Sequence, residues 1–471
     1  MSGIVPGGTG ARPEPTGTRG RVAMVVRNAV SGDSRVRKSA SALAAAGWDV
    51  TVFGTSPDGV EHRLELDGVP VVLVPVPRVL TAGGPRARRA AWRELGHRDA
   101  ALRGSARLRF GTLPLPGRPG RLARTAAGAL TPGGGWRRLD PWVQEVELAL
   151  APCVEALDPD VIHAHDHYTA PLAARSCAVL RRRGRDVRWV HDAHELSVAT
   201  ADRGAGGLRG VLRRRMVGGM LAELVPTADA VVTVSDDLAE RLRADLRLTE
   251  RPVVVLNAPP VAAGRPAPSL RERAGVRPED PLLVYAGGLA PPRGVDLAVR
   301  ALLALSGVHL ALVAPDGDPQ LAALRALADG LGVGERLHAV PYVAPDQVVD
   351  YLAGADAGLV PLRHRPNHEI SLVTKYMEYA QARLPLVVSD VRVMAAFTRE
   401  HGFGEVFRVR DGAPGLATAV RTVLADPRRY RGAYDAAGDV LARLTWEEQS
   451  GVLTALYEHV RCTSGSRTHA V

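Results

Sequence analysis

Lysine is almost absent from this chain. Only Lys38 and Lys375 are lysines among its 60 basic residues, and all the others are arginines. Because arginine is the default cation here, a lysine at position 375 indicates a need for a compact point charge, which the planar guanidinium fork does not supply. Cysteine is also scarce. Cys153, Cys177 and Cys462 show no metal-type spacing and no paired framework, so we expect reduced thiols in a cytosolic protein.

Other absences exclude whole classes of protein. No run of about 18 apolar residues occurs, so no membrane-spanning helix is expected. Residues 1–20 are rich in Gly, Pro and Thr and lack the apolar core of a signal peptide, which predicts a disordered leader. Aromatic residues make up only 4%, yet apolar residues reach 46% of 471. This length and composition predict two or three packed domains built from Ala, Val and Leu.

Positive charge is concentrated in one segment. The net charge is +10, and residues 78–138 contain 14 arginines against only Glu94 and Asp99. Arginines mixed with single apolar residues could lie on an anionic membrane surface. A solvated insertion is the alternative. Nucleic acid is the least favoured partner, because only Trp92 and Phe110 could stack on bases. The expected location is the cytoplasm, with peripheral attachment at the inner membrane face as a variant.

Short Val-rich runs alternate with helical patterns in two series along the chain. The first series extends from 21–27 to 230–234 and the second from 282–285 to 405–408. Strands alternating with helices predict parallel, doubly wound sheets. Pro and Ala interrupt the pattern between the series, near 257–268. We therefore expect an α/β fold with two Rossmann-like domains that face a central cleft, where such folds bind ligands.

The expected domain boundaries follow from these patterns. The N-terminal domain should cover 21–258 and carry 78–138 as a basic insertion. The C-terminal domain should cover 259–444. Residues 445–471 begin with an amphipathic pattern, which predicts a C-terminal helix that crosses back toward the N-terminal domain.

Lys375 lies in the first turn of a predicted helix. There it would join free backbone N–H groups and the positive end of the helix dipole in an anion site. Glu378 lies three residues on, on the same helical face. The pair suggests that Lys375 holds a phosphate and Glu378 a neighbouring pair of hydroxyls, as in a nucleotide's diphosphate and ribose. A solvated Lys–Glu pair remains the alternative.

Glycines mark two strand-to-helix turns. Gly32 follows the first strand, and Gly287 and Gly288 follow the strand at 282–285. Glycine at such a turn lets a ligand approach the backbone N–H groups closely. Arg293 begins the next helical segment and could stand opposite Lys375 across a diphosphate. Neither turn has the GxGxxG spacing, so a dinucleotide fingerprint is absent.

Histidines and acids follow two neighbouring strands. Alternation along a strand puts His163 and His165 on one face and Asp166 on the other. A second cluster follows the strand at 187–190 and contains His191, Asp192, His194 and Glu195. Zinc binding, structural hydrogen bonding and contacts to a substrate all remain open, although neither cluster has the HExxH spacing of a helical zinc site.

Several motifs together resemble a known family. They are Asp-Val-Ile-His-Ala-His-Asp at 160–166, Val-His-Asp-Ala-His-Glu-Leu at 190–196, Ala-Asp-Ala-Val-Val-Thr-Val-Ser-Asp at 228–236, Tyr-Ala-Gly-Gly-Leu at 285–289 and Lys-Tyr-Met-Glu-Tyr at 375–379. From about residue 21 to 460, the chain resembles a retaining GT-B glycosyltransferase of the family 4 type. The resemblance implies that the N-terminal domain binds the acceptor and the C-terminal domain a nucleotide-sugar donor.

The resemblance also implies residue roles. Arg293 and Lys375 would stabilise the donor diphosphate, Glu378 would bind the ribose, and His165 would lie by the reacting sugar. Further donor-binding candidates are Gly32, Gly287, Gly288, Asn367, His368, Glu369, Ser371, Leu372 and Val373. Candidates for a polar cluster on the acceptor side are Asp166, His191, His194 and Glu195. The chain departs from the family pattern at Ile370, where Glu is frequent, at Val373, where Pro is usual, and at Gly288, where many members have Arg.

The implied activity is transfer of a sugar, with retention of configuration, from a UDP- or GDP-type donor. The acceptor is a sugar, a lipid-linked molecule or another small molecule, and no cofactor or metal is obligatory. The departing phosphate could take the acceptor's proton. Two alternatives remain: a sugar-nucleotide epimerase or hydrolase on the same fold, and a basic module that binds membrane or nucleic acid through 78–138.

Overall fold

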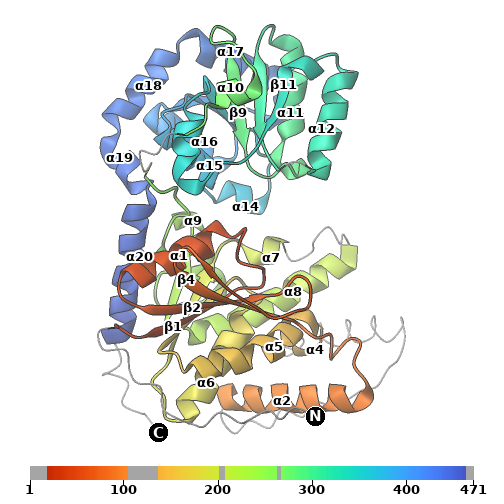
Figure 1. The fold of residues 1–471 in the computed structure, drawn as a ribbon, viewed down its shortest axis with the longest axis vertical. Coiled ribbons are helices and arrows are strands. Elements are labelled where there is room, and N and C mark those ends of the chain that lie inside the picture. Colours follow the sequence, from red (N-terminus) through yellow and green to blue (C-terminus); the bar gives the residue numbers. More distant parts are fainter. Residues whose placement is uncertain are drawn as a thin grey trace.

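The chain folds into two α/β domains with one long helix running beside the first of them (Figure 1). The computed structural model describes residues 18–103, 136–139, 141–200, 207–261, 267–315 and 317–462. Most of the expected leader, residues 104–135 of the basic insertion and the last nine residues lie outside the described residues. Within the described part, no helix is long and apolar enough to cross a bilayer.

The N-terminal domain is built on an eight-stranded sheet with the order β3-β4-β2-β1-β5-β6-β7-β8. All neighbouring strands are parallel except β3 and β4. Its strands are β1 (Arg21–Val25), β2 (Asp49–Thr55), β3 (His62–Leu66), β4 (Val69–Val74), β5 (Val161–His165), β6 (Arg188–Ala193), β7 (Ala230–Thr233) and β8 (Val253–Val254). Its helices are α1 (Ser34–Ala45), α2 (Pro85–Arg103), α4 (Trp136–Leu139), α5 (Pro141–Leu157), α6 (Ala170–Arg182), α7 (Ser197–Thr200), α8 (Gly207–Leu224), η1 (Val225–Thr227) and α9 (Asp236–Leu246).

The C-terminal domain is built on a six-stranded parallel sheet with the order β11-β10-β9-β12-β13-β14. Its strands are β9 (Leu282–Ala286), β10 (His309–Val313), β11 (Leu337–Val340), β12 (Ala357–Val360), β13 (Leu386–Ser389) and β14 (Gly404–Phe407). Its α-helices are α10 (Leu270–Ala274), α11 (Val295–Ala301), α12 (Pro319–Gly330), α13 (Val348–Leu352), α14 (Pro366–Glu369), α15 (Thr374–Gln381), α16 (Arg392–His401), α17 (Gly412–Ala425), α18 (Pro427–Ala436) and α19 (Gly438–Arg443). Its 3-10 turns are η2 (Pro291–Arg293), η3 (Leu302–Ala304), η4 (Gly334–Arg336), η5 (Pro345–Gln347) and η6 (Val409–Asp411).

Both sheets are covered on two faces, which explains their Val-rich central strands. The residues of β9 and β13 are all buried, as are Val22 to Val25 of β1. Separate apolar clusters fill the two sides of each sheet. Parallel strands need apolar residues on both faces because helices pack on each side. The expectation of two doubly wound sheets is therefore confirmed.

The last helix, α20 (Trp446–Cys462), belongs to the N-terminal core. Leu453, Tyr457 and Val460 are buried in the same cluster as Val22 and Val50. The chain thus passes between the domains twice. The two crossings touch, because the backbone N–H of Trp446 donates to the carbonyl of Pro259 at 2.7 Å.

Helix α2, the first part of the basic segment, is anchored by buried ion pairs. Arg98 donates to Glu147 at 2.9 Å and to Glu155 at 2.7 Å. Arg175 on α6 joins Glu147 to Asp99 at 2.7 and 2.9 Å. Buried charges need such partners, because an unpaired one is costly. Helix α2 of the basic segment is therefore docked on the N-terminal domain.

Candidate functional site

The histidines of β5 meet the acid of β6 at the ends of two paired strands. The register sets His165 directly beside Asp192. The rings of His163 and His165 stack with centroids 4.4 Å apart, so they share one face as expected from strand alternation. Asp166 turns the chain away with a left-handed φ of 61°.

Asp192 is held by Arg35 from α1. The guanidinium Nε and Nη2 lie 2.9 Å from the carboxylate oxygens, and Nη1 donates to the carbonyl of Val255 at 2.7 Å. Burial alone would raise the pKa of Asp192, but the positive charge of Arg35 and the nearby histidines hold that pKa well below its usual range. The carboxylate therefore stays ionised and accepts hydrogen bonds on this side of the sheet.

His165 is fully buried, and one of its ring nitrogens has no hydrogen-bond partner among the described residues. Its Nδ1 lies 3.0 Å from Nε2 of His194 and 3.5 Å from Oδ2 of Asp192. Burial, followed by the neighbouring His163, lowers the pKa of His165 well below its usual value, so the ring is neutral. Its Nε2 is shielded from solvent and has no hydrogen-bond partner among the described residues. A neutral imidazole whose second ring nitrogen lacks a hydrogen-bond partner can position a hydroxyl.

The other residues predicted on the acceptor side make different contacts from those of His165. His194 bridges to Asp166, with 3.6 Å between Nδ1 and Oδ2. Burial raises the pKa of Asp166. His191 contacts Trp189, 6.1 Å between ring centroids, and burial lowers its pKa to about 4. The structure thus brings His165, His194 and Asp166 together, while the His191 ring lies against Trp189.

A zinc site fits this cluster poorly. Ligand atoms of His163, His165 and Asp192 lie within 4.8 Å of one another. However, Arg35 already occupies both carboxylate oxygens, and Nδ1 of His163 is 2.7 Å from the hydroxyl of Tyr457. A divalent cation would have to displace or repel the buried guanidinium. The donor set therefore favours a hydrogen-bonded array over metal binding.

Lys375 lies in the first turn of α15 and faces the glycine turn after β9. Only 8% of Lys375 is exposed, and its Nζ lies 3.6 Å from the ring centroid of Tyr285. A Cβ added to Gly287 would come within 3.1 Å of Nζ, and Gly287 has a φ of 110°. The turn therefore needs glycine both for its backbone conformation and to make room for the ammonium group.

Arg293 supplies a second positive charge near Lys375. Burial, and then the charge of Arg293, lower the pKa of Lys375 well below its usual value, while Glu378 opposes the shift. No hydrogen bond or salt bridge engages the Arg293 side chain within the described part of the chain. Gly294, which follows with a φ of 71°, lies so close to the Pro361 carbonyl that a Cβ would clash. Two cations with one nearby carboxylate form a site that favours an anion.

The charges of both lysines of the chain act on the pKa of Glu378. Burial raises its pKa, and the charges of Lys375 and Lys38 oppose that rise. Lys38, on α1 of the N-terminal domain, donates to the carbonyl of Ala258 and lies 4.9 Å from the ring centroid of Trp446. Burial lowers the pKa of Lys38 to about 8. The only two lysines therefore act on one carboxylate, one from each domain.

Asn367 joins the two domains. Its Oδ1 accepts the backbone N–H of Leu196 at 2.7 Å, and its Nδ2 donates to Oε2 of Glu195 at 3.3 Å. Burial raises the pKa of Glu195, and Arg293 is among the charges that oppose the rise. The polar residues after β6 are thus electrostatically coupled to the anion site in the other domain.

Glu369 secures the loop before α15. Its Oε1 lies 2.6 Å from Nδ1 of His364, and its Oε2 accepts the backbone N–H of Arg392 at 2.8 Å. Nε2 of His364 lies 3.0 Å from Asp390. At Ile370, where the family often has Glu, the carbonyl accepts the hydroxyl of Ser235 at 2.5 Å. Glu369 is thus engaged by its own domain, while position 370 contacts the other one.

The remaining donor-side candidates line the loop and turns. Nδ1 of His368 lies 2.6 Å from the carbonyl of Arg363, and Val373 caps α15 without a side-chain hydrogen bond. Ser371, Leu372 and Val373 are half-buried. The carbonyl of Gly288 accepts the hydroxyl of Tyr285 at 2.7 Å. Gly32 has open space around it. Their roles toward a donor remain predictions.

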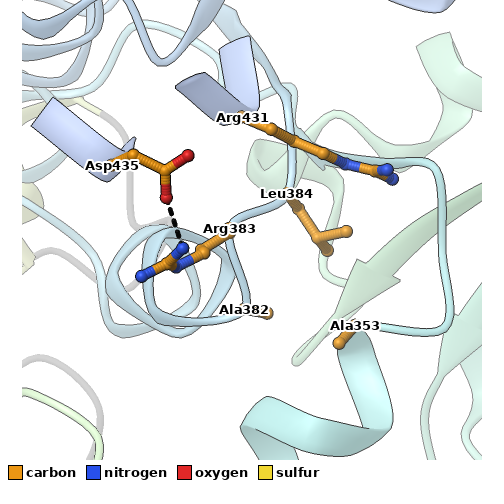
Figure 2. A pocket seen from close by; sticks show the side chains of 6 residues that line it. All are labelled: Ala353, Ala382, Arg383, Leu384, Arg431 and Asp435. Carbon is orange, nitrogen blue, oxygen red and sulfur yellow. Dashed lines mark hydrogen bonds and ion pairs between the residues drawn. The ribbon is translucent and has the colours of Figure 1, made fainter. Parts of the chain in front are cut away.

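A separate hollow opens at the other end of α15 (Figure 2). It has a volume of about 380 Å³ and is lined by Ala353, Ala382, Arg383, Leu384, Arg431 and Asp435. Figure 2 shows Arg383 paired with Asp435. Lys375 lies in the first turn of α15, whereas Arg383 follows the last turn. The hollow is therefore distinct from the anion site.

Comparisons with known proteins agree with this geometry. Residues 32–258 match the family described as glycosyl transferase 4-like domain, and residues 280–426 match glycosyl transferases group 1. The chain belongs to the GT-B glycosyltransferases of the family 4 type. Both matches overlap the sheets that carry the two halves of the site.

Relatives of this chain show how far the likeness extends. A D-inositol 3-phosphate glycosyltransferase from Acidothermus cellulolyticus is 29% identical over 58% of this chain and 58% of its own length. The chain therefore spans about three fifths of that relative. Sucrose-phosphate synthase from Thermosynechococcus elongatus has a TM-score of 0.65 at 17% identity, covering 94% of this chain and 100% of the other. Anabaena HepE in complex with UDP and glucose has a TM-score of 0.62 at 14% identity, covering 93% and 100%. These structures share the fold.

Sequence reasoning missed several residues of the candidate site. Arg35 and Tyr457 support the histidine array, and Tyr285 packs on Lys375. Asp192 is part of the cluster predicted after the strand at 187–190. Tyr457 had no signal in the sequence, since it reaches His163 from 294 positions away.

Proposed function

We propose that this chain is a retaining glycosyltransferase that moves a sugar from a nucleoside diphosphate donor, of the UDP or GDP type, to a hydroxyl acceptor. The observation that carries the proposal is the buried Lys375 beside the Gly287 turn, with Arg293 near enough for its charge to lower the pKa of Lys375. A site with two cations in a glycine-lined turn suits a leaving diphosphate, whose charge must be stabilised in the transition state. A UDP-type donor is supported by the solved complex of HepE, which contains UDP.

The residues have distinct roles in this proposal. Lys375 and Arg293 neutralise the diphosphate while the bond from the sugar carbon to the phosphate oxygen breaks. Glu378 accepts hydrogen bonds from the ribose hydroxyls. The acceptor oxygen attacks the same face of the sugar, and its proton passes to the departing phosphate oxygen. His165 positions a sugar hydroxyl through Nε2, which has no hydrogen-bond partner among the described residues. The products are a nucleoside diphosphate and a glycoside with the donor's configuration.

The acceptor is proposed by class only. The polar residues after β5 and β6, among them His194, Asp166 and Glu195, would receive the acceptor. Hydroxyl-rich acceptors suit such neutral and acidic side chains, which can accept hydrogen bonds from several hydroxyls. The curated relative named for D-inositol 3-phosphate supports a small polyol or sugar.

Nucleotide binding provides the first test. Melting temperature is measured with UDP, GDP, ADP and TDP for wild type, Lys375→Ala and Glu378→Ala. We expect a base-selective rise in wild type that both variants lose, and a fall in turnover of about a hundredfold to a thousandfold for Lys375→Ala. Arg300→Ala serves as a control, because Arg300 is an exposed arginine of α11 in the same domain. A shift that is unchanged in Lys375→Ala would reject the assigned site.

The stereochemistry of the product tests the proposed retention of configuration. With a sugar nucleotide that raises the melting temperature, products are analysed by NMR in the presence and absence of polyol acceptors. Retention requires the product to keep the donor's anomeric configuration. An inverted product would reject the proposed same-face mechanism. Conversion of the donor at an unchanged rate without acceptor, or to an epimer, would instead favour a hydrolase or an epimerase.

A further inference from the structure

Lys38 lies where the two chain segments that connect the domains meet. From α1 of the N-terminal domain, its Nζ donates to the carbonyl of Ala258 in the first connection at 2.5 Å. The same Nζ lies 4.9 Å from the ring centroid of Trp446 in the second connection. The two connections touch each other through the hydrogen bond from Trp446 to Pro259. One ammonium group therefore contacts both connections, in a chain whose other cations, apart from Lys375, are arginines.

Helix α15 of the C-terminal domain is fixed to the second connection on its Glu378 face. Gln381 lies three residues after Glu378, so the two side chains share a face of the helix. Nε2 of Gln381 donates to two carbonyls at the end of α19, at 2.7 and 3.2 Å. The end of α19 leads directly to Trp446, whose ring faces Lys38. The fold therefore brings Glu378 within range of the Lys38 charge, and the charge of each group acts on the pKa of the other.

The Glu378 carboxylate depends on neighbouring cations to stay ionised. It is half-buried and forms no hydrogen bond or ion pair within the described part of the chain. Burial raises its pKa, and the charges of Lys375 and Lys38 oppose the rise. Ionisation matters for binding a ribose, because a carboxylate accepts hydrogen bonds at both oxygens, whereas a protonated carboxyl group must donate from one of them.

A bound diphosphate changes this balance of charge. Its oxygens would contact Lys375, and their negative charge would itself disfavour a carboxylate nearby. Lys38 would then remain as the cation that supports Glu378. We propose that Lys38 is a positioning residue of the donor site, whose ammonium group keeps the Glu378 carboxylate ionised for the ribose while the diphosphate engages Lys375. This inference rests on the proposed function and extends nucleotide binding to a residue of the N-terminal domain.

The ionisation of Lys38 sets the pH range in which it can act. Burial is the main cause that lowers the pKa of Lys38 to about 8. The charges around it are Glu378 on α15, which opposes the shift, Arg35 on α1, which adds to it, and Glu447 on α20, which opposes it. Lys38 thus supports Glu378 below about pH 8. Without this charge the pKa of Glu378 should rise further, so the carboxylate should become protonated at a higher pH than in wild type.

Titration calorimetry of the full chain with UDP tests this role between about pH 5 and about pH 8. If GDP, ADP or TDP raises the melting temperature instead, that nucleotide replaces UDP. Lys38→Met and Lys38→Gln both remove the charge, although Gln can still donate a hydrogen bond. In both variants the pH below which UDP affinity falls should rise by about one unit, which lowers affinity about tenfold on the acid side. Lys38→Arg keeps the charge and should keep the wild-type profile.

A double-mutant cycle identifies the group through which Lys38 acts. When Glu378→Gln is already present, adding Lys38→Met should change UDP affinity by less than about twofold. Inorganic pyrophosphate has no ribose, so its affinity should be nearly the same in Lys38→Met and wild type. Arg37→Met is the matched control, because it removes the neighbouring cation of α1, which pairs with Asp67 at 2.7 Å. Its pH profile should match that of wild type.

Several results would overturn the inference while leaving the nucleotide site in place. They are an unchanged pH profile in Lys38→Met, an equal effect of Lys38→Met with and without Glu378, equal losses of UDP and pyrophosphate affinity, and the same shift in Arg37→Met. UDP affinity that is unchanged in Lys375→Ala would instead reject the proposed nucleotide site, and this inference with it.

Discussion

At the scale of single residues, the protonation state of Lys375 governs what its site can hold. Burial and Arg293 lower the pKa of Lys375, so its ammonium form is disfavoured in the free protein. A bound diphosphate would favour that form again. Nucleotide binding should therefore draw a proton from solution, and affinity should fall as the pH rises through the lowered pKa.

Calorimetry can measure this proton uptake. The apparent enthalpy of UDP binding should vary with the ionisation enthalpy of the buffer, and the slope should correspond to proton uptake. Lys375→Arg should abolish the slope, because a guanidinium is charged at all relevant pH values. A slope that is unchanged in Lys375→Arg would assign the proton to another group, with His165 as the next candidate.

Gly287 and Gly288 are neighbouring glycines in which the effect of an added Cβ can be compared. A Cβ at Gly287 would press on Nζ of Lys375 at 3.1 Å and force a strained φ of 110°, whereas a Cβ at Gly288 meets nothing within 4 Å. We expect Gly287→Ala to cost about 1–3 kcal/mol of unfolding free energy and to weaken UDP binding. Gly288→Ala should change stability by less than about 0.5 kcal/mol. Urea unfolding and calorimetry measure both, and equal effects would contradict this account.

Individual residues are predictable where the sequence itself is unusual. Lys375 stands out because the chain has only one other lysine. The structure places it beside Gly287, and its role in an anion site stays a prediction. Asn367 and Glu369 are predicted to contact a donor, yet both form hydrogen bonds with protein groups. Composition cannot reveal such engagement, because the partners Leu196 and Arg392 approach only in the folded chain.

At the scale of elements, the loop before α15 depends on His364. This imidazole lies between Glu369 and Asp390, and the hydrogen bond to Glu369 is the main cause of its raised pKa. Because this pKa is raised by folding, the stabilising contacts of protonated His364 with Glu369 and Asp390 are fully present below the pKa of the unfolded chain, about 6.5. They are lost as the pH rises through the pKa of the folded protein.

Hydrogen exchange should detect that loss. Protection factors in residues 364–370, corrected for intrinsic rates, should fall as the pH rises above about 6.5. His364→Gln should remove most of this pH dependence while leaving the sheet strands protected. A pH dependence that persists in His364→Gln would show that another group controls the loop.

Elements with long buried apolar runs are predictable from the sequence, and exposed ones are not. All six strands of the second sheet fall at the Val- and Leu-rich runs that predict them. Strand β3 is not expected from the sequence, because its residues His62 to Leu66 are mostly exposed and polar. It is held by antiparallel pairing with β4. An edge strand of this kind gains its conformation from a partner and gives no periodic signal of its own.

At the scale of the whole molecule, α20 connects the C-terminus to the histidine array. The hydroxyl of Tyr457 lies 2.7 Å from Nδ1 of His163, with both groups buried. Tyr457→Phe should lower the unfolding free energy by about 1–2 kcal/mol, because a buried ring nitrogen loses its partner. Tyr342→Phe is the control, since Tyr342 is 51% exposed. Thermal unfolding measures both, and equal losses would contradict a role for the His163 contact.

The double crossing near Pro259 and Trp446 changes how this molecule can be divided. In topological terms, the C-terminal sheet is an insertion within the N-terminal domain, because α20 completes the core that β1 begins. A gene fragment ending at 258 would encode a sheet whose core lacks Leu453, Tyr457 and Val460. A circular permutant that joins α20 directly to the N-terminal segment would instead keep that core continuous in sequence.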